Sequence, residues 1–325
     1  MKPIGGYFEL ADREEGKFYP HRNGFHLNTG RNALEFILKS LGNVKRVYLP
    51  YYTCDVVLEP LRRLGIAWTF YHINNHFEVD EDMSLEAGEY VIVNNYYGIK
   101  DDYISLVAAK FGDRLIVDCA QAFFAPAIDG IKCFYSARKF VGVADGGIAY
   151  TFNNNISVDN LEYDDSASHS EHLIIRKEKG AEAGFAIYRE DEEKLNEQQM
   201  RRMSSYTEDI LLHINCKNVI EKRHENYVSL NESLGKYNML ILPENSSFSC
   251  PMAYPLMVSN GAEIRKRLID NKVFVPRFWP NEIIPDEIID KNMLSDVILP
   301  LPIDQRYTEA DMSRIAEIVE KQIKK

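Results

Sequence analysis

Residues 115–150 read LIVDCAQAFFAPAIDGIKCFYSARKFVGVADGGIAY. The apolar run that opens this stretch ends in a carboxylate, Asp118, and a lysine, Lys139, follows a second apolar run. Each apolar run has the length and composition of a buried strand. Paired glycines, Gly146-Gly147, come shortly after the lysine. The stretch therefore places one acid and one lysine at the ends of two expected strands.

This arrangement is the one that a pyridoxal phosphate (PLP) site requires. PLP withdraws electrons best with its ring nitrogen protonated, and a carboxylate held against that nitrogen keeps the proton in place. A lysine must also form a Schiff base with the PLP aldehyde. Taken singly, Asp118 and Lys139 have ordinary interpretations, a strand-end cap and a solvated charge, because most Asp and Lys side chains are exposed. Together they favour a PLP site with both as catalytic residues.

The stretch also resembles the DegT/StrS type of PLP-dependent aminotransferases, which are best known as sugar aminotransferases. The resemblance is carried by a D-x-A-Q/H segment at 118–121, a serine-containing run at 136–139 and the paired glycines. It continues through IGGYFEL, NTGRNAL, LPYYTC, NNYYG, VFVPRFWP and LPLPIDQRYT, and so spans nearly the whole chain. It implies the fold type I architecture, an α/β fold with a mostly parallel sheet. We expect a large PLP-binding domain with an N-terminal arm at 1–205 and a small α/β domain at 206–325.

The resemblance assigns two further PLP ligands near the lysine. Gln121 matches the position that touches the ring hydroxyl or the ring face. Ser136 is a candidate phosphate ligand, although many relatives carry that serine five residues before the lysine, where this chain has Phe134. Arg138 is expected to point away into solvent, because neighbours on an extended chain face opposite ways.

Residues 28–34, NTGRNAL, open a helix that suits a phosphate. Free N–H groups and the positive end of the helix dipole meet at such a start, and the resemblance places the PLP phosphate here. The family usually has a small hydroxyl residue after the glycine, whereas this chain has Arg31 after Gly30. Thr29, the backbone of Arg31 and Asn32, and the Arg31 side chain are the open alternatives. A helix cap without a ligand explains the segment equally well.

Tyrosine pairs follow two of the expected strands, Tyr51-Tyr52 and Tyr96-Tyr97. In the family, an aromatic residue after one of these strands covers a face of the PLP ring. The second member of each pair is a candidate for this role, as is ordinary packing. Core or interface packing, the usual use of aromatic side chains, is favoured for the first member of each pair.

Arg277 lies in the segment PRFWP at 276–280. A guanidinium at this place in the fold can hold a substrate carboxylate through a forked pair of hydrogen bonds. Packing against Trp279 is an equally good interpretation.

Composition limits the class of protein. A length of 325 residues with 45% hydrophobic residues is enough for a large core. The formal net charge of −11 argues against nonspecific binding to nucleic acid or to an anionic membrane. The five cysteines are odd in number and widely spaced, without a C-x-x-C motif, which favours reduced thiols over disulfides or zinc. No signal region or membrane-length apolar run occurs, so we expect a soluble cytoplasmic protein.

Strand and helix patterns alternate before the lysine. Strands are expected at 46–49, 67–71, 89–93 and 115–117, with helices at 55–64 and 103–111. This rhythm predicts a mostly parallel sheet with helices on both faces and a ligand beyond the carboxyl ends of the strands. Farther along, we expect a long helical stretch from about 192 to 233, broken near 204–205 or 215. Strands are expected at 240–242, 254–258 and 273–275, a helix at 262–269, and a terminal helix after a capping box at 308–311.

His169 and His172 stand near several acids. Two histidines at this spacing can ligate a metal, but without a third well-spaced ligand a solvated loop is favoured, and no metal site is expected. Residues 177–193 are strongly charged and are interpreted as a surface loop or as a helix at a dimer edge.

The resemblance implies ping-pong transamination in a homodimer whose sites borrow residues from both chains. Glutamate is the expected amino donor, and a nucleotide-linked keto sugar is the expected acceptor. A different acceptor is an alternative, because the chain departs from the family at Arg31 and Phe134. Another reaction type is a second alternative, although dehydrating relatives usually replace the lysine with histidine. A non-catalytic PLP-binding or regulatory protein is the third.

Overall fold

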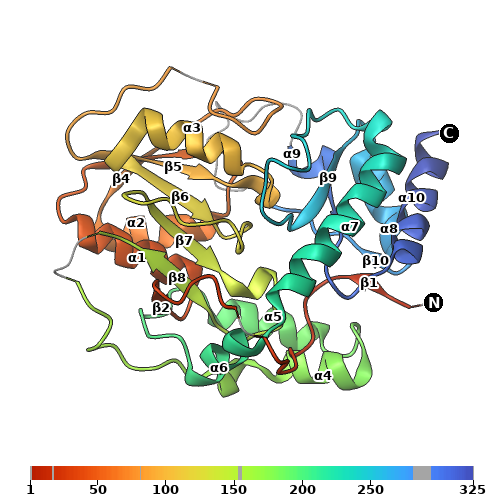
Figure 1. Ribbon diagram of the computed structural model, residues 1–325, viewed down its shortest axis with the longest axis horizontal. Coiled ribbons are helices and arrows are strands. Elements are labelled where there is room, and N and C mark those ends of the chain that lie inside the picture. Colours follow the sequence, from red (N-terminus) through yellow and green to blue (C-terminus); the bar gives the residue numbers. More distant parts are fainter. Residues whose placement is uncertain (1, 17, 81, 153–155, 281–293, 325) are drawn as a thin grey trace.

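The computed structural model describes residues 2–16, 18–80, 82–152, 156–280 and 294–324. Within these residues the largest sheet has seven strands in the order β2-β8-β7-β6-β5-β3-β4 (Figure 1). Its strands are β2 (Phe25–Leu27), β3 (Arg46–Pro50), β4 (Ala67–Tyr71), β5 (Glu89–Asn94), β6 (Leu115–Cys119), β7 (Lys132–Ser136) and β8 (Gly147–Tyr150). Neighbouring strands from β4 to β7 are parallel, whereas β8 is antiparallel to β7 and to β2. The expected mostly parallel sheet is confirmed.

Helices cover both faces of this sheet. Successive strand residues face opposite ways, so Ile92 and Ile116 pack in the cluster formed with α1 (Gly30–Leu41) and α2 (Leu58–Leu64). Val91 and Val117 pack in the cluster on the other face, which includes residues of α3 (Asp101–Phe111). Burying each such side chain contributes roughly 1.5–3 kcal/mol, which explains why these strands are apolar on both faces.

The carboxyl ends of the parallel strands share one edge with the start of α1. β7 ends at Ser136, which pairs with Gly147, the first residue of the antiparallel β8. Gly147 also pairs with Leu27, the last residue of β2, and the chain enters α1 three residues later. The turn after β7, the start of β8 and the start of α1 therefore meet at this edge.

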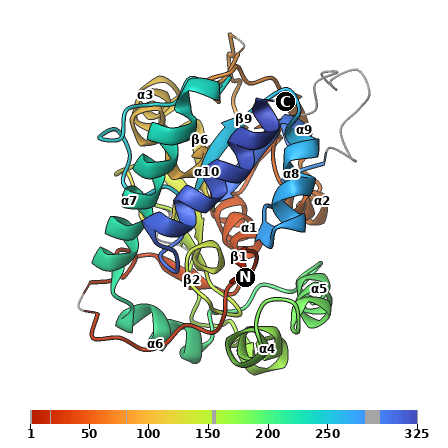
Figure 2. The same cartoon turned by 90° about the vertical axis from the view of Figure 1, so that its right-hand side faces the viewer.

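A second region lies beside the sheet. β9 (Ala253–Met257) and β11 (Ile298–Pro302) pair antiparallel, with α7 (Cys216–Leu234), α8 (Gly261–Asp270), α9 (Leu294–Val297) and α10 (Glu309–Ile323) around them. β1 (Ile4–Gly5) pairs in parallel with β10 (Val273–Phe274). The N-terminal arm therefore starts against the C-terminal region, as Figure 2 shows.

Most expected elements occur close to their predicted bounds. The strand at 67–71 coincides with β4, and the capping box of Thr308 and Asp311 precedes α10. The predicted helical stretch at about 192–233 is divided into α6 (Ser205–His213) and α7, and its first residues are the end of α5 (Phe185–Lys194). Ser204 and Asn215 cap α6 and α7, so both proposed break points are helix starts.

The strand predicted at 240–242 is wrong. The reason is Asn238, whose side-chain oxygen accepts hydrogen bonds from the N–H groups of Leu240 and Met257, at 3.1 and 2.9 Å. The Asn238 side chain thus occupies the N–H groups of Leu240 and Met257, which a strand would use for pairing with β9.

The solvated loop predicted around His169 and His172 is also wrong. Both rings are buried, with 4% and 2% of their surface exposed. His172 lies on a helix, α4 (Glu171–Lys179), and pairs with Asp191, whereas His169 pairs with the nearby Asp164. Among the described residues no group of three or more His, Cys, Asp or Glu side chains is placed to hold a metal.

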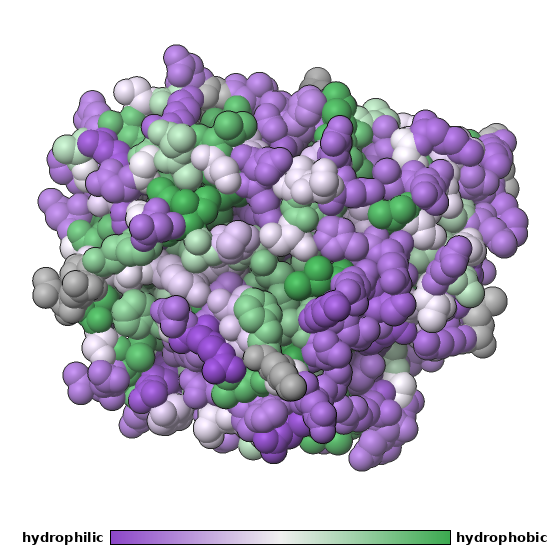
Figure 3. All heavy atoms as spheres, in the orientation of Figure 1, coloured by the Kyte–Doolittle hydropathy of each residue, from purple (hydrophilic) through white to green (hydrophobic). Residues whose placement is uncertain are grey.

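The described helices include none that is long and apolar enough to cross a membrane. Hydrophilic side chains dominate the half of the face in Figure 3 that lies over α7, and hydrophobic ones show more over the half with the large sheet.

Candidate active site

Asp118 lies buried at the end of β6, with 8% of its surface exposed. Its Oδ1 accepts a hydrogen bond from the Ala120 N–H at 2.8 Å, and no described residue bonds Oδ2. Burial raises the pKa of Asp118 to about 6, although the Ala120 N–H and the Lys139 ammonium oppose the rise. A carboxylate in such surroundings gains from a further cationic partner. A protonated pyridine nitrogen is such a partner.

Lys139 ends the short turn Ala137–Lys139 that follows β7, the neighbour of β6 in the sheet. Its charge lowers the pKa values of both Asp118 and Cys54, which brings these three side chains into one electrostatic group. Burial nevertheless raises the pKa of the Cys54 thiol. Cys54 lies in the segment that follows β3, and its local sequence does not indicate this proximity to Asp118 and Lys139.

The start of α1 faces Ser136. Thr29 is the N-cap, and its hydroxyl accepts a hydrogen bond from the Asn32 N–H at 3.2 Å. A Cβ added to Gly30 would lie 3.7 Å from the Cβ of Ser136. The first N–H groups of a helix, here those of Gly30 and Arg31, have no acceptor inside the helix. These groups and Ser136 together suit an anion.

The side chains of Arg31 and Asn32 already have protein partners. Arg31 Nη1 donates to Glu59 at 2.5 Å and to Asn196 at 3.1 Å. Asn32 Nδ2 donates to Asn28 at 2.8 Å. Among the open alternatives for the phosphate, this geometry favours the backbone over the Arg31 side chain.

Gln121 presents a buried donor without a partner. Its side-chain oxygen accepts a hydrogen bond from the Tyr97 N–H at 2.9 Å. Its Nε2 is buried and has no hydrogen-bond partner among the described residues. Leaving a buried donor unpaired costs roughly 1–3 kcal/mol. An oxygen of a bound ligand would remove this cost, so the residues present fit a PLP ring with a hydroxyl at this place.

Tyr52 and Tyr97 join through their hydroxyls, which lie 2.9 Å apart. Both side chains are almost completely buried. Trp279 meets Tyr52 edge-on with ring centroids 4.6 Å apart, and Phe278 lies 6.4 Å from Tyr97. Tyr96 donates to the Tyr52 carbonyl at 2.5 Å. The tyrosines thus form an aromatic cluster, and stacking of Tyr52 or Tyr97 on PLP stays a prediction.

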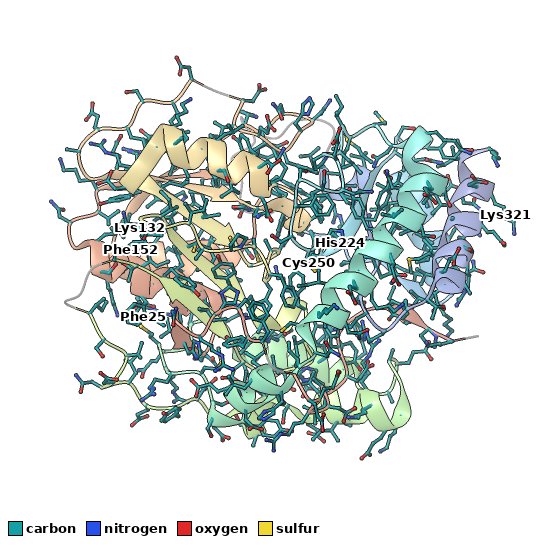
Figure 4. The ribbon with its side chains drawn as sticks, in the orientation of Figure 1. Phe25, Lys132, Phe152, His224, Cys250 and Lys321 are labelled. Atoms are coloured by element: carbon teal, nitrogen blue, oxygen red, sulfur yellow. The ribbon has the colours of Figure 1, made fainter. Side chains whose placement is uncertain are left out.

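Gly98 lets the C-terminal region close on the strand ends. Its φ is +69°, and a Cβ there would lie 2.5 Å from the Cys250 carbonyl oxygen and 2.8 Å from that of Gln121. His224 of α7 bonds the neighbouring Ser249 carbonyl at 2.9 Å. Cys250 and His224, labelled in Figure 4, mark this junction between α7 and the large sheet.

A cavity of about 720 Å³ extends from Lys139 and Ser136 toward the N-terminal arm, α4, α5 and the small strands. Arg138 lines it and pairs with Glu192, so the expectation that Arg138 points into solvent is wrong. Arg223 also lines it from α7, and its guanidinium lies 4.5 Å from the Phe140 ring. No local motif identifies Arg223, because only the packing of α7 brings it here.

Arg277 is not brought together with Lys139 in this structure. Its Nε and Nη2 donate to the two carboxylate oxygens of Asp296 at 2.7 and 3.1 Å. Its neighbours Pro276 and Phe278 line the cavity, but Arg277 does not.

No protein-family model and no curated protein matches this chain. Solved structures do match it. S. venezuelae DesV, solved in complex with a ketimine intermediate, is 15% identical with a TM-score of 0.66, over 93% of this chain and 85% of that one. A DegT DnrJ EryC1 StrS aminotransferase from Brucella abortus is 16% identical with a TM-score of 0.60, over 93% and 86%. 3-amino-5-hydroxybenzoic acid (AHBA) synthase is 14% identical with a TM-score of 0.64, over 94% and 87%.

The chain has an aminotransferase fold. These likenesses cover nearly the whole of it, and its mostly parallel central sheet fits fold type I. The fold that the DegT/StrS resemblance implied is therefore confirmed, while activity is a separate question, because one fold hosts many reactions.

Proposed function

We propose that this chain is a PLP-dependent aminotransferase. The observation that carries the proposal is the meeting of Asp118 and Lys139 at the ends of adjacent parallel strands, beside the N-terminus of α1. Ligands of parallel α/β sheets bind at this edge. A buried carboxylate, a lysine and an anion-binding helix start are the three groups that PLP needs there.

Each part of PLP has a candidate partner in this chain. The phosphate is proposed to bind the N–H groups of Gly30 and Arg31 and the Ser136 hydroxyl. Asp118 would hold the ring nitrogen, and the unpaired Nε2 of Gln121 would donate to the ring hydroxyl. Thr29 and Asn32 fix the helix start through their cap hydrogen bond, so they are proposed to act indirectly.

The chemistry follows from these positions. Bound PLP supplies an electron sink that stabilises negative charge on the carbon next to the donor nitrogen. Asp118 would keep the ring nitrogen protonated. Once released from the cofactor, Lys139 Nζ would take the proton from the donor α-carbon and, as a general acid, would deliver it to the cofactor carbon that carried the aldehyde. The same two residues serve the second half of the reaction in the reverse direction.

The proposal also names a donor, an acceptor and an assembly. Glutamate is the proposed donor, and a nucleotide-linked keto sugar is the proposed acceptor, in a cytoplasmic homodimer. A different keto acceptor is the second candidate, because AHBA synthase shares the fold at a similar TM-score. A substrate role for Arg277 requires it to leave Asp296, to which both of its forked donors are bonded.

The test is the visible absorbance of purified protein with PLP, before and after glutamate. The expected result is a band from lysine-bound cofactor that glutamate removes. Lys139→Ala should lack the band, while Lys110→Ala should keep it, because the Lys110 side chain is 51% exposed on α3.

The absence of a band in folded wild-type protein would reject the cofactor assignment. A band that survives glutamate and a panel of other amino acids would reject aminotransfer and favour a non-catalytic PLP-binding protein. If another amino acid removes the band and glutamate does not, that amino acid replaces glutamate as the proposed donor.

A further inference from the structure

His172 and Asp191 form a buried pair in the wall of the cavity that holds Lys139. His172 lies on α4 and Asp191 on α5, and each has 2% of its surface exposed. His172 Nδ1 lies 2.6 Å from Asp191 Oδ2, and the other carboxylate oxygen accepts a hydrogen bond from Lys194 at 2.7 Å. An aspartate that binds one ring nitrogen fixes the tautomer of the histidine and the direction of the ring.

The second ring nitrogen of His172 faces accessible space. Within the described part of the chain no hydrogen bond reaches Nε2. Nε2 is also absent from the fully buried polar atoms that lack a partner, such as Nε2 of His169. Because His172 is almost completely buried and lines the cavity, we infer that Nε2 opens into the cavity.

The surroundings of His172 favour a neutral ring with a free lone pair. Burial lowers the pKa of His172 below its usual value, although the hydrogen bond and the charge of Asp191 oppose the change. The charged and titratable groups around the ring are Asp191, Glu192 and Lys194 of α5, Arg138, Arg176 on the same helix, and the hydroxyls of Tyr7 and Tyr188. With Nδ1–H donated to Asp191, a neutral His172 offers Nε2 as an acceptor.

The pair is linked to the proposed catalytic lysine through one ion pair. Arg138, the residue before Lys139, binds Glu192, the residue after Asp191. Lys139, Arg138, Glu192 and His172 all line the same cavity. A ligand that fills the cavity from Lys139 toward α4 therefore meets Nε2 of His172.

We propose that His172 is a second acid–base group of this site, which takes a proton from the ammonium or hydroxyl group of a ligand in the cavity. The inference rests on the proposed aminotransferase function and adds to it. An amino donor arrives as an ammonium ion, and its nitrogen must lose one proton before it can form a bond to the cofactor. The N–H bond breaks, its proton forms the Nε2–H bond of His172, and the Asp191 carboxylate stabilises the resulting imidazolium.

A structural interpretation is also available, since the pair ties α4 to α5, and the experiment must separate the two. The rate at which glutamate removes the visible band of the PLP-loaded protein is measured from about pH 6 to pH 9. We compare wild type with His172→Gln and Asp191→Asn. His169→Gln is the matched control, because His169 is equally buried and lies beside an aspartate, 3.6 Å from Asp164, but does not line this cavity.

General base catalysis typically contributes about 10²–10⁴-fold, so His172→Gln should slow the reaction at neutral pH by at least about tenfold. Its pH profile should move upward, because solvent then has to deprotonate the donor. Asp191→Asn should lower the rate less than His172→Gln does, and its pH profile should still depend on the histidine. An unchanged profile in His172→Gln, or the same change in His169→Gln, overturns the proposal.

A second measurement works without turnover. Nitrogen-15 NMR of the histidine rings in the PLP-free protein should show the proton of His172 on Nδ1 at neutral pH and a bare Nε2. A proton on Nε2 overturns the inference even if the enzyme transaminates. A bare Nε2 in a protein whose band no amine removes rejects the proposed function instead, and with it the role assigned to His172.

Discussion

Gly147, the first residue of β8, lies against Thr29, the N-cap of α1, so closely that a Cβ on Gly147 would be 2.1 Å from the Thr29 carbonyl oxygen. No side chain can be accommodated at that distance without moving backbone. The second of the paired glycines thus positions the helix start at the candidate phosphate site. It does so through the close approach of two backbone segments.

Gly147→Ala should therefore be strongly destabilising. Overpacking typically costs about 1–3 kcal/mol, and here backbone rather than a flexible side chain must move, so we expect at least about 3 kcal/mol. Gly30→Ala is the matched control, because its Cβ would meet nothing closer than 3.7 Å. Urea unfolding of both variants tests this, and equal stabilities would contradict the geometry.

The pH dependence of stability should report the burial of Asp118. Because its folded pKa, about 6, is raised above the usual value of an aspartate in an unfolded chain, the unfolded state loses its proton first as pH rises. Stability is then lost with rising pH between the two pKa values. The Asp118→Asn variant should not lose stability in this way, because its side chain does not titrate.

Without PLP, the Asp118→Asn variant should gain about 2 kcal/mol relative to wild type between about pH 4 and pH 8, from about 1.36 kcal/mol per pKa unit. Urea unfolding at the two pH values measures it. Asp129→Asn, at an exposed position, should show no such gain. A pH-independent difference for Asp118→Asn would show that its carboxyl is not held in the neutral form.

Gln121 should contribute a hydrogen bond to PLP binding. In Gln121→Glu the Tyr97 N–H keeps an acceptor, but the unpaired donor at Nε2 is lost. We expect a loss of stability, because the new carboxyl is buried, and PLP affinity weakened roughly tenfold, equal to about 1.4 kcal/mol. Gln121→Leu should lose both stability and PLP affinity, because the acceptor for the Tyr97 N–H and the donor at Nε2 are both removed. Titration with PLP followed by absorbance measures the affinity, and unaltered binding in Gln121→Glu would exclude the proposed hydrogen bond.

The hydroxyl pair of Tyr52 and Tyr97 should show coupling. Removing one hydroxyl leaves the other buried and unpaired, so Tyr52→Phe and Tyr97→Phe should each cost roughly 1–2 kcal/mol. The double variant should cost less than the sum, by about 1 kcal/mol, in a double-mutant cycle from denaturant unfolding. Strict additivity would mean that the 2.9 Å contact contributes no stability.

Local patterns were sufficient for most elements. Apolar runs predicted β3 to β6, and they are most continuous in β5 and β6 because a buried parallel strand must be apolar on both faces. The same approach failed at 240–242, where one side chain, Asn238, takes the hydrogen bonds of a strand neighbour. No apolar pattern records such a substitution.

The candidate site divides in the same way. Asp118, Lys139, Gln121 and Ser136 follow strand ends within one short stretch, so their residue types and their spacing alone indicate a cofactor site. Cys54 follows β3, whereas Arg223 and His172 lie on α7 and α4, and no local sequence pattern places these three at a cofactor site. Arg31, a candidate by motif, has its side chain bonded to Glu59.

The sequence by itself determined the alternation of strands and helices, the acid and lysine at two strand ends, and the glycines that allow close backbone approach. These are local properties, set by side-chain polarity and backbone freedom over a few residues. Only the tertiary structure decided which distant side chains share the cavity and which charges are neutralised by a partner. Those relations depend on the packing of α4, α5 and α7 against the sheet, which joins residues far apart in the chain and leaves no periodic trace in the sequence.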